Sequence, residues 1–148
     1  MAGKNKTEKG FRLYFDDSGN SARDLSASLV PGSVTMGYTL EQVDMTAVSD
    51  TMKNYLAGHA DAPVTAKFYL DDTATTGAHT VLKGVLGATK TLTLQWGSDG
   101  AAPTTGDPEW EGEYTYFGGG VSMEGGRAVI SAEWRPGSAT AAAWGTVS

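Results

Sequence analysis

Two alternating segments in the last third of the chain constrain its fold more than any other feature. Residues 110–116 and 127–134 both alternate apolar with polar side chains, which is the pattern of half-buried β-strands. Between them, Glu124-Gly125-Gly126 supplies residues that tolerate positive φ in a tight reversal. We therefore expect a long β-hairpin here, within a mainly β domain.

Composition agrees with a turn-rich β architecture and excludes several classes of protein. The chain has 148 residues, of which 40% are apolar and 19% charged, so it is neither disordered nor a coiled coil. Its 20 glycines favour strands joined by tight turns over a helical bundle. The absence of cysteine excludes disulfides, thiolate nucleophiles and sulfur-ligated metals, so stability depends on packing, pairing or assembly.

Three earlier segments alternate in the same way. Phe11, Leu13 and Phe15 share one face of a short first strand, and residues 64–70 and 91–96 follow the same period of two. A different spacing follows residue 75 and predicts one short helix at about residues 76–87, begun by a threonine cap and ended by a glycine. The apolar face of this helix consists of Ala78, Val81, Leu82, Val85 and Leu86.

The segment between the first and second of these strands is less regular. Residues 34–48 are strand-like, but their apolar positions change phase, and a one-residue bulge near Glu41-Gln42 explains the change. Residues 50–63 have no clean period. They form either a long hairpin extension or a loop.

The beginning of the chain differs in charge from the rest. Residues 1–10 are polar and lysine-rich, and we expect a flexible basic arm ahead of a single domain at residues 11–148. The remainder holds the acidic excess behind a net charge of −6, which does not favour tight binding to DNA phosphates. No apolar run is long enough to cross a bilayer, and the start lacks the hydrophobic centre of a signal peptide. We therefore expect a protein made and kept in a cytoplasm.

Residues with catalytic or metal-binding chemistry are few. His59-Ala60-Asp61 places two candidate ligands, or a base and its orienting group, close together, but no third ligand is apparent. The nucleophile-elbow, phosphate-loop and dinucleotide-binding glycine patterns are absent. The sequence therefore predicts a protein that is not an enzyme and holds no cofactor or metal.

Acidic and aromatic residues leave alternatives open. One face of an expected strand carries three glutamates, Glu109, Glu111 and Glu113. This face is either a solvated surface, a surface that DNA passes without sticking, or the source of the two carboxylates of a glycosidase. The tryptophans allow sugar stacking. However, those at 96, 110 and 134 alternate in step with apolar neighbours, which favours core packing or subunit contact. The alternative function is a small carbohydrate-binding β-sandwich module or a glycosidase.

The order of motifs near the C-terminus resembles a known family. A W-x-G-E strand at Trp110, a small-residue turn, an S-A-x-W strand at Ser131 and a closing W-G-T-V at Trp144 resemble the end of major tail tube proteins of long-tailed, siphovirus-type bacteriophages. The likeness extends over most of the chain. It includes the Gly-Ala-His-Thr-Val-Leu helix from Gly77 and the T-L-T-L-Q-W strand from Thr91.

The resemblance implies a β-sandwich or partial barrel with one short flanking α-helix, completed by neighbours in a ring. In that family six subunits form a ring, and rings stack into the tube through which DNA is ejected. The implied partners are further copies of the chain, a tape-measure protein, tail-end proteins and DNA that passes without sticking, with no membrane insertion. The implied location is the virion tail, after assembly in the host bacterial cytoplasm.

The resemblance also assigns candidate site residues. The candidates for the lumen are the acidic residues Glu41, Asp44, Glu109, Glu111 and Glu113. The candidates for contacts with adjacent subunits or the next ring are Asp50, Met52, Tyr55 and His59. Strand parity identifies which of these residues share a face, but not which face is the inside of a tube.

Overall fold

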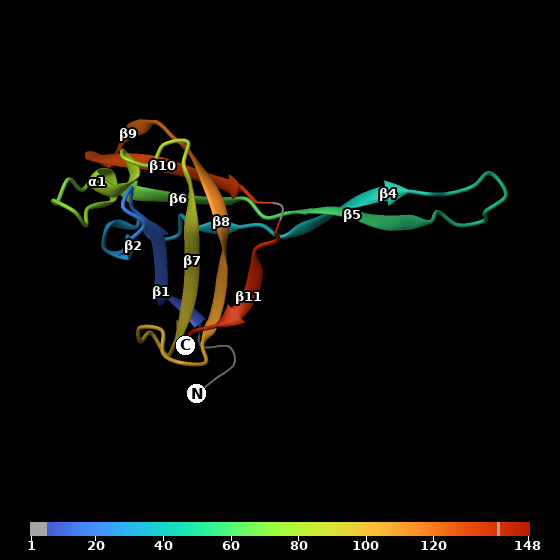
Figure 1. Ribbon diagram of the computed structural model, residues 1–148, viewed down its shortest axis with the longest axis horizontal. Coiled ribbons are helices and arrows are strands. Elements are labelled where there is room, and N and C mark those ends of the chain that lie inside the picture. The colour runs from blue at the N-terminus through green and yellow to red at the C-terminus, as the bar shows by residue number, and fades with distance from the viewer. Residues whose placement is uncertain (1–5, 139) are drawn as a thin grey trace.

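The computed structural model describes residues 6–138 and 140–148, and it consists of a β-sheet body from which one long hairpin projects (Figure 1). Within these residues there are eleven strands, one short 3-10 turn and one α-helix. The strands are β1 (Lys6–Asp16), β2 (Ala22–Asp24), β3 (Thr35–Met36), β4 (Thr39–Asp44), β5 (Tyr55–Asp61), β6 (Val64–Tyr69), β7 (Thr89–Ser98), β8 (Pro108–Gly118), β9 (Val121–Glu124), β10 (Arg127–Pro136) and β11 (Ala143–Thr146). The 3-10 turn spans Ser26–Ser28, and α1 spans Ala78–Leu82.

One antiparallel sheet forms the body, in the order β2-β1-β7-β8-β10-β6-β3, with β11 paired to β8 and β9 paired to β10. Two strands separate β1 from β10 along this path, yet the ring of Phe15 on β1 lies 5.6 Å from that of Trp134 on β10. The sheet therefore folds over on itself. This is the mainly β, partly closed sandwich expected from the sequence.

The core lies between the folded halves of this sheet and under α1. Leu13, Phe15, Phe68, Trp110 and Trp134 have no exposed surface, as the alternating pattern predicts. The interpretation of the tryptophans at 110 and 134 as core residues is confirmed, and their burial removes the platform on which a sugar would stack. Truncating such a ring to alanine typically costs about 3–5 kcal/mol of stability.

The expected strand at residues 34–48 is two strands with a break. Strand β3 pairs with β6 in the body, after which the chain leaves the sheet at Gly37. Among the described residues, β4 pairs with β5 alone. Residues 50–63 thus form the hairpin extension, not a loop. A register shift lies between Leu40 and Gln42, where a bulge is expected, but the extra residue is on β5. Since β4 itself has no extra residue, its side chains alternate without interruption, and its apolar residues lie on both faces of the hairpin.

The helix is shorter than residues 76–87, the range that the sequence predicts. The α1 helix covers Ala78–Leu82, starts after Gly77 and has no side-chain cap, so the predicted threonine cap is wrong. After Lys83 the turns tighten to i→i−3 hydrogen bonds through Gly84, a residue that disfavours helix. Its face is buried as expected except at Leu86, which is 66% exposed.

The predicted flexible arm at residues 1–10 is wrong for residues 6–10, which belong to β1, while residues 1–5 lie outside the described residues. Lys6 pairs with Ser98 on β7, and its ammonium donates to Ser98 Oγ at 2.6 Å. The same ammonium forms an ion pair with Asp107 at 3.2 Å. A strand can thus begin at a lysine, because the ammonium of Lys6 reaches polar partners at the end of the sheet.

The C-terminal hairpin is confirmed but interrupted. The β9–β10 turn is made by Gly125 and Gly126, whose φ values of 60° and 81° suit a tight hairpin reversal. Between β8 and β9, Gly119 approaches β10 so closely that an added Cβ would lie 1.2 Å from the carbonyl oxygen of Ser131. Only glycine fits there, so β8 and β9 pair with successive parts of β10.

Among the described residues, no helix is long and apolar enough to cross a bilayer.

Candidate assembly surfaces

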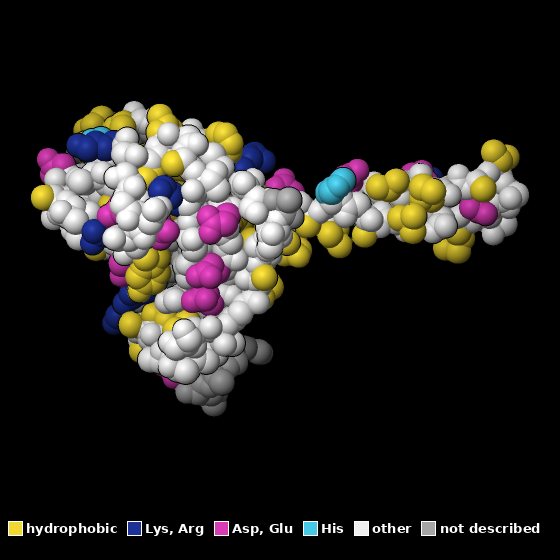
Figure 2. Space-filling model, viewed as in Figure 1, with side chains coloured by type: hydrophobic (Ala, Val, Ile, Leu, Met, Phe, Trp, Pro, Cys, Tyr) yellow, Lys and Arg dark blue, Asp and Glu magenta, His cyan; other side chains and the backbone are white. Residues whose placement is uncertain are grey.

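The three glutamates of β8 form an acidic row on the outer face of the sheet, opposite a row of polar residues on β7. Each carboxylate accepts a hydrogen bond from the residue across from it. The pairs are Gln95 Nε2 with Glu109 at 2.7 Å, Thr93 Oγ1 with Glu111 at 3.0 Å and Thr91 Oγ1 with Glu113 at 2.7 Å. Figure 2 shows acidic side chains in a row down this face. Cross-strand bonds thus hold the carboxylates in place while leaving them open to solvent on the sheet surface.

Asp16, at the end of β1, extends this acidic row. Its burial raises the pKa of its carboxyl, the negative charge of Glu113 raises it further, and a backbone hydrogen bond involving Thr91 opposes the shift. The strand register places Asp16 level with Glu113, because Phe15 pairs with Leu92 on β7 and Leu92 pairs with Gly112 on β8. The row therefore runs from β8 across the sheet toward β1.

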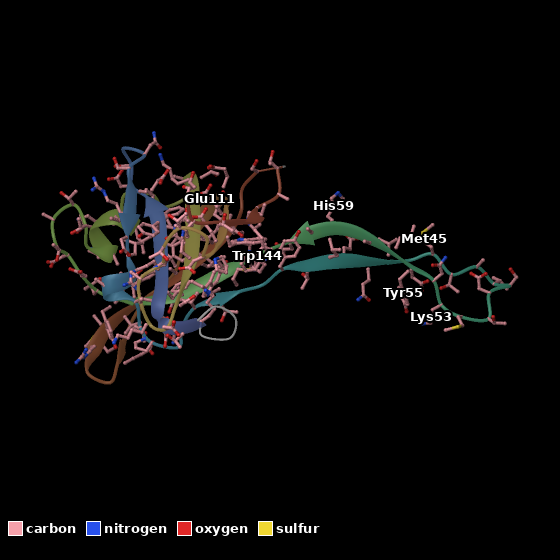
Figure 3. All side chains as sticks on the ribbon, turned by 90° about the horizontal axis from the view of Figure 1, so that it is seen from below. Met45, Lys53, Tyr55, His59, Glu111 and Trp144 are labelled. Carbon is pink, nitrogen blue, oxygen red and sulfur yellow. The ribbon has the colours of Figure 1, made fainter. Side chains whose placement is uncertain are left out.

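The second surface is the projecting hairpin, which we call the arm and define as residues 37–62. All four residues expected at subunit contacts lie on it, at Asp50, Met52, Tyr55 and His59, and all four are exposed. Figure 3 shows Tyr55 and His59 on the arm, far from Glu111 on the body. Among the described residues, His59 has one acidic partner, Glu41 on β4, whose Oε2 lies 3.7 Å from His59 Nδ1.

The structure divides the five candidates for the lumen. Glu109, Glu111 and Glu113 lie together on the body, whereas Glu41 and Asp44 lie on β4 of the arm, away from that row. The two sets therefore do not form one surface within a single chain. Whether either set faces a lumen stays a prediction.

Both faces of the arm carry apolar side chains. Paired residues share a face, so Leu40 with Ala60 and Asp44 with Tyr55 lie on one face, and Val43 with Leu56 lies on the other. This follows from the bulge being on β5. A two-stranded ribbon that is apolar on both faces has no layer within its own chain to bury either face, and such a surface marks an interaction site.

Aromatic rings anchor the base of the arm to the body. The ring of Tyr38, just before β4, packs edge-on against Trp110 with 4.9 Å between ring centroids. Trp144 on β11 lies 5.2 Å from Trp110 and 5.4 Å from Trp96, so the last strand belongs to the same cluster. The ring of Trp96 also lies 5.5 Å from that of the buried Phe11, so Trp96 contacts both core and surface aromatics, consistent with packing.

Sequence reasoning missed a third surface, an apolar patch at the end of the body that holds α1. Its members are Leu86, Phe117, Val121 and Met123, all of them more than half exposed. The available signal was Phe117, which follows the inward Tyr116 and therefore must point outward. The sequence places Leu86 on the buried face of the predicted helix, so it gives no indication that Leu86 belongs to an exposed patch.

Comparison with known proteins rests on structure. No protein family model matches the chain, and no curated protein matches it. A chain in the virion of a native gene transfer agent particle superposes with a TM-score of 0.68 at 13% identity, covering 97% of this chain and 99% of that one. This chain has the fold of that virion component.

Two further structures agree. A chain in the tail of an empty gene transfer agent particle, solved with C6 symmetry, gives a TM-score of 0.58 at 16% identity, covering 100% of this chain and 99% of that one. A chain of the six-fold symmetrised baseplate of the anti-feeding prophage gives 0.58 at 10% identity, with coverage of 99% and 95%. At identities this low, the superpositions establish the fold alone. That fold is the one expected from the resemblance to tail tube proteins.

Proposed function

We propose that this chain is a structural, non-enzymatic subunit of a phage-type tail tube, whose copies form six-membered rings that stack into a conduit for DNA. The observation that carries the proposal is the likeness of fold to a component of a C6-symmetric tail, over 100% of this chain and 99% of that one. The alignment covers 100% of this chain, so the aligned residues include those of the arm.

The surfaces of the chain suit repeated self-association. Strand β2 pairs only with the last three residues of β1, so the earlier part of that edge has no strand partner among the described residues. The arm is a two-stranded ribbon without a covering layer. Open strand edges and two-sided apolar ribbons are covered when a neighbour supplies the missing strand or surface. A ring of identical subunits provides such neighbours at every position.

The acidic row suits a lumen. Carboxylates of Glu109, Glu111 and Glu113 repeated around a ring would present a negative wall to DNA phosphates, which prevents them from sticking during passage. In this proposal Glu41 and Asp44 either reach the lumen from the arm of each subunit or contact a neighbour. The further partners are a tape-measure protein and tail-end proteins, and the location is the virion tail after assembly in the host cytoplasm.

Light scattering and negative-stain electron microscopy of the purified chain, alone and with its tape-measure protein, test the proposal. We expect rings or tubes with a central channel. A chain that stays monomeric under all assembly conditions, with the tape-measure protein present, would contradict it.

A further inference from the structure

Two exposed apolar surfaces lie at opposite ends of the molecule. The first is the tip of the arm, residues 45–54, where Val48 is fully exposed and Met52 is 81% exposed. The second is the patch near α1, where Met123 is 71% exposed. Figure 1 places the arm tip and the α1–β9 end at the two ends of the longest axis, so a chain cannot bring its own tip to its own patch.

Local hydrogen bonds order the tip. The carboxylates of Asp44 and Asp50 accept from the backbone N–H groups of Thr46 and Ala47, at 2.9 and 2.8 Å. The backbone N–H of Asn54 donates to Thr46 Oγ1 at 2.8 Å. These bonds tie the two sides of the tip together while Val48 and Met52 stay exposed. A pre-ordered loop loses less conformational entropy on binding than a flexible one, so its apolar side chains are effective anchors.

The patch contains a groove that can receive such anchors. A cavity of about 390 Å³ lies between α1 and the β8–β9 connection. It is lined by His79, Leu82, Lys83, Leu86, Tyr116, Phe117, Gly118, Gly119, Val121 and Ile130. The lining is mostly apolar, and apart from Tyr116 its ionisable members are His79 and Lys83, which are both basic. Figure 2 shows apolar side chains gathered around this end of the body.

The charges of the two surfaces are complementary. Asp44 and Asp50 flank the apolar side chains of the tip, with Lys53 as the opposing charge. Hydrogen bonds from the Thr46 side chain and backbone lower the pKa of Asp44, so this carboxylate stays ionised near neutral pH. The groove offers Lys83 and no carboxylate among its lining residues. Opposite charges at the rim favour one orientation of docking and speed encounter.

We propose that the arm tip of one copy docks in the α1–β9 groove of a second copy, with Val48 and Met52 against Leu86, Phe117 and Val121. The inference rests on the proposed function and adds the surface that receives the arm. The contact is heterologous, since it joins two different surfaces of the same chain. Each copy therefore keeps one free tip and one free groove, and the contact propagates from copy to copy into a ring or a longer assembly.

Cross-linking between engineered cysteines tests this directly, because the chain has no cysteine of its own. Met52→Cys marks the tip and Phe117→Cys marks the groove, each in an otherwise intact full-length chain. A third variant, Ala101→Cys, marks an exposed loop between β7 and β8 as a matched control. The variants are assembled alone and in equal mixtures, treated with a short bismaleimide, and resolved by denaturing electrophoresis.

We expect covalent dimers from the mixture of Met52→Cys with Phe117→Cys, at least tenfold above either variant alone and above the mixture of Met52→Cys with Ala101→Cys. Dimers from Met52→Cys alone at the same yield would overturn the proposal in favour of contact between tips. Assemblies that form without the expected cross-link would overturn it while leaving the proposed function intact. Failure to assemble under any condition would overturn both.

Mixing of disruptive variants gives a second, independent measurement. Val48→Asp and Phe117→Asp change exposed positions, so each variant should fold and each should fail to assemble alone. A mixture still contains one intact tip and one intact groove, on different chains. We expect it to form dimers that grow no further, measured by analytical ultracentrifugation. A mixture that remains monomeric would contradict the proposal.

Discussion

Strands β5 and β6 are neighbours in the chain, separated only by Ala62 and Pro63, yet their environments are opposite. In β6 the side chains of Val64, Ala66 and Phe68 are buried, whereas in β5 Leu56 is 54% exposed. Both strands are antiparallel and both contain apolar residues. The difference is that the other half of the folded sheet covers one face of β6, whereas β5 has no strand partner except β4 among the described residues.

The body and the arm therefore obtain stability from different sources. The body buries a continuous core of its own. A two-stranded hairpin is marginally stable by itself in water, so the arm relies on its anchoring at Tyr38 and, in our proposal, on a second copy. Substitutions should therefore separate the two regions, with folding affected in the body and assembly affected in the arm.

The largest effect on stability is expected from Trp134→Ala in the body. Its ring has no exposed surface and contacts Phe15, Phe68 and Tyr116. We expect the free energy of unfolding to fall by about 3–5 kcal/mol, measured by urea denaturation followed by circular dichroism. Trp134→Phe is the matched control and should lose far less, because the buried indole Nε1 has no hydrogen-bond partner among the described residues. An equal loss in both variants would contradict this account.

The next effect concerns the polar face of the body, where three carboxylates are hydrogen-bonded across the β7–β8 pair. Replacing Glu109, Glu111 and Glu113 together by lysine removes three cross-strand hydrogen bonds but leaves the buried face unchanged. We expect a folded subunit and normal-looking tails whose DNA release is slowed at low salt and partly restored at high salt.

DNA release from assembled particles, measured at several salt concentrations, checks this expectation, with tube formation monitored by microscopy. Unchanged release at every salt concentration would mean that the row faces the outside of the tube. Tubes that never form would mean that the row lies at a subunit contact.

A smaller effect on stability is expected in the arm. Replacing residues 46–53 by Asn-Gly, a sequence suited to a two-residue hairpin turn, removes the tip while retaining β4 and β5. We expect the melting temperature of the body to change by no more than about 2 °C, because surface changes away from the core are usually within about 0.5 kcal/mol. Assembly should be lost. Calorimetry and light scattering measure the two outcomes, and a large fall in melting temperature would show that the arm stabilises the body.

The smallest effect is expected from Asp16→Asn, at the end of the acidic row. Burial and the charge of Glu113 raise the pKa of Asp16 in the folded state above its ordinary value of 3.8, so ionisation opposes folding. The stability that the protonated carboxyl contributes is present below that ordinary value and is lost as pH rises through the folded pKa. We expect the variant to be more stable than the original chain at pH 7, with the difference shrinking toward pH 3. Thermal denaturation across this range would contradict the account if the difference grew as pH fell.

Alternation within the chain determined much of the body. The inward faces at Phe11, Leu13 and Phe15, the buried tryptophans at 110 and 134, and the shared face of the three glutamates all follow from a period of two. The reversal at Gly125 and Gly126 was also predictable from the sequence, because tolerance of positive φ is a property of glycine itself. These features are local, and a sequence read along its length contains them.

Only the tertiary structure decided where the chain leaves the body and which apolar residues remain uncovered. Leu40 and Leu56 have the character of core residues, and Leu86 fits the apolar face of a helix, yet all three are more than half exposed. The position of the bulge on β5 and the close approach of Gly119 to β10 likewise depend on partners that are distant in the sequence. Alternation determines which side chains share a face, but burial requires a second layer across from that face, and that layer comes from elsewhere in the chain or from another copy.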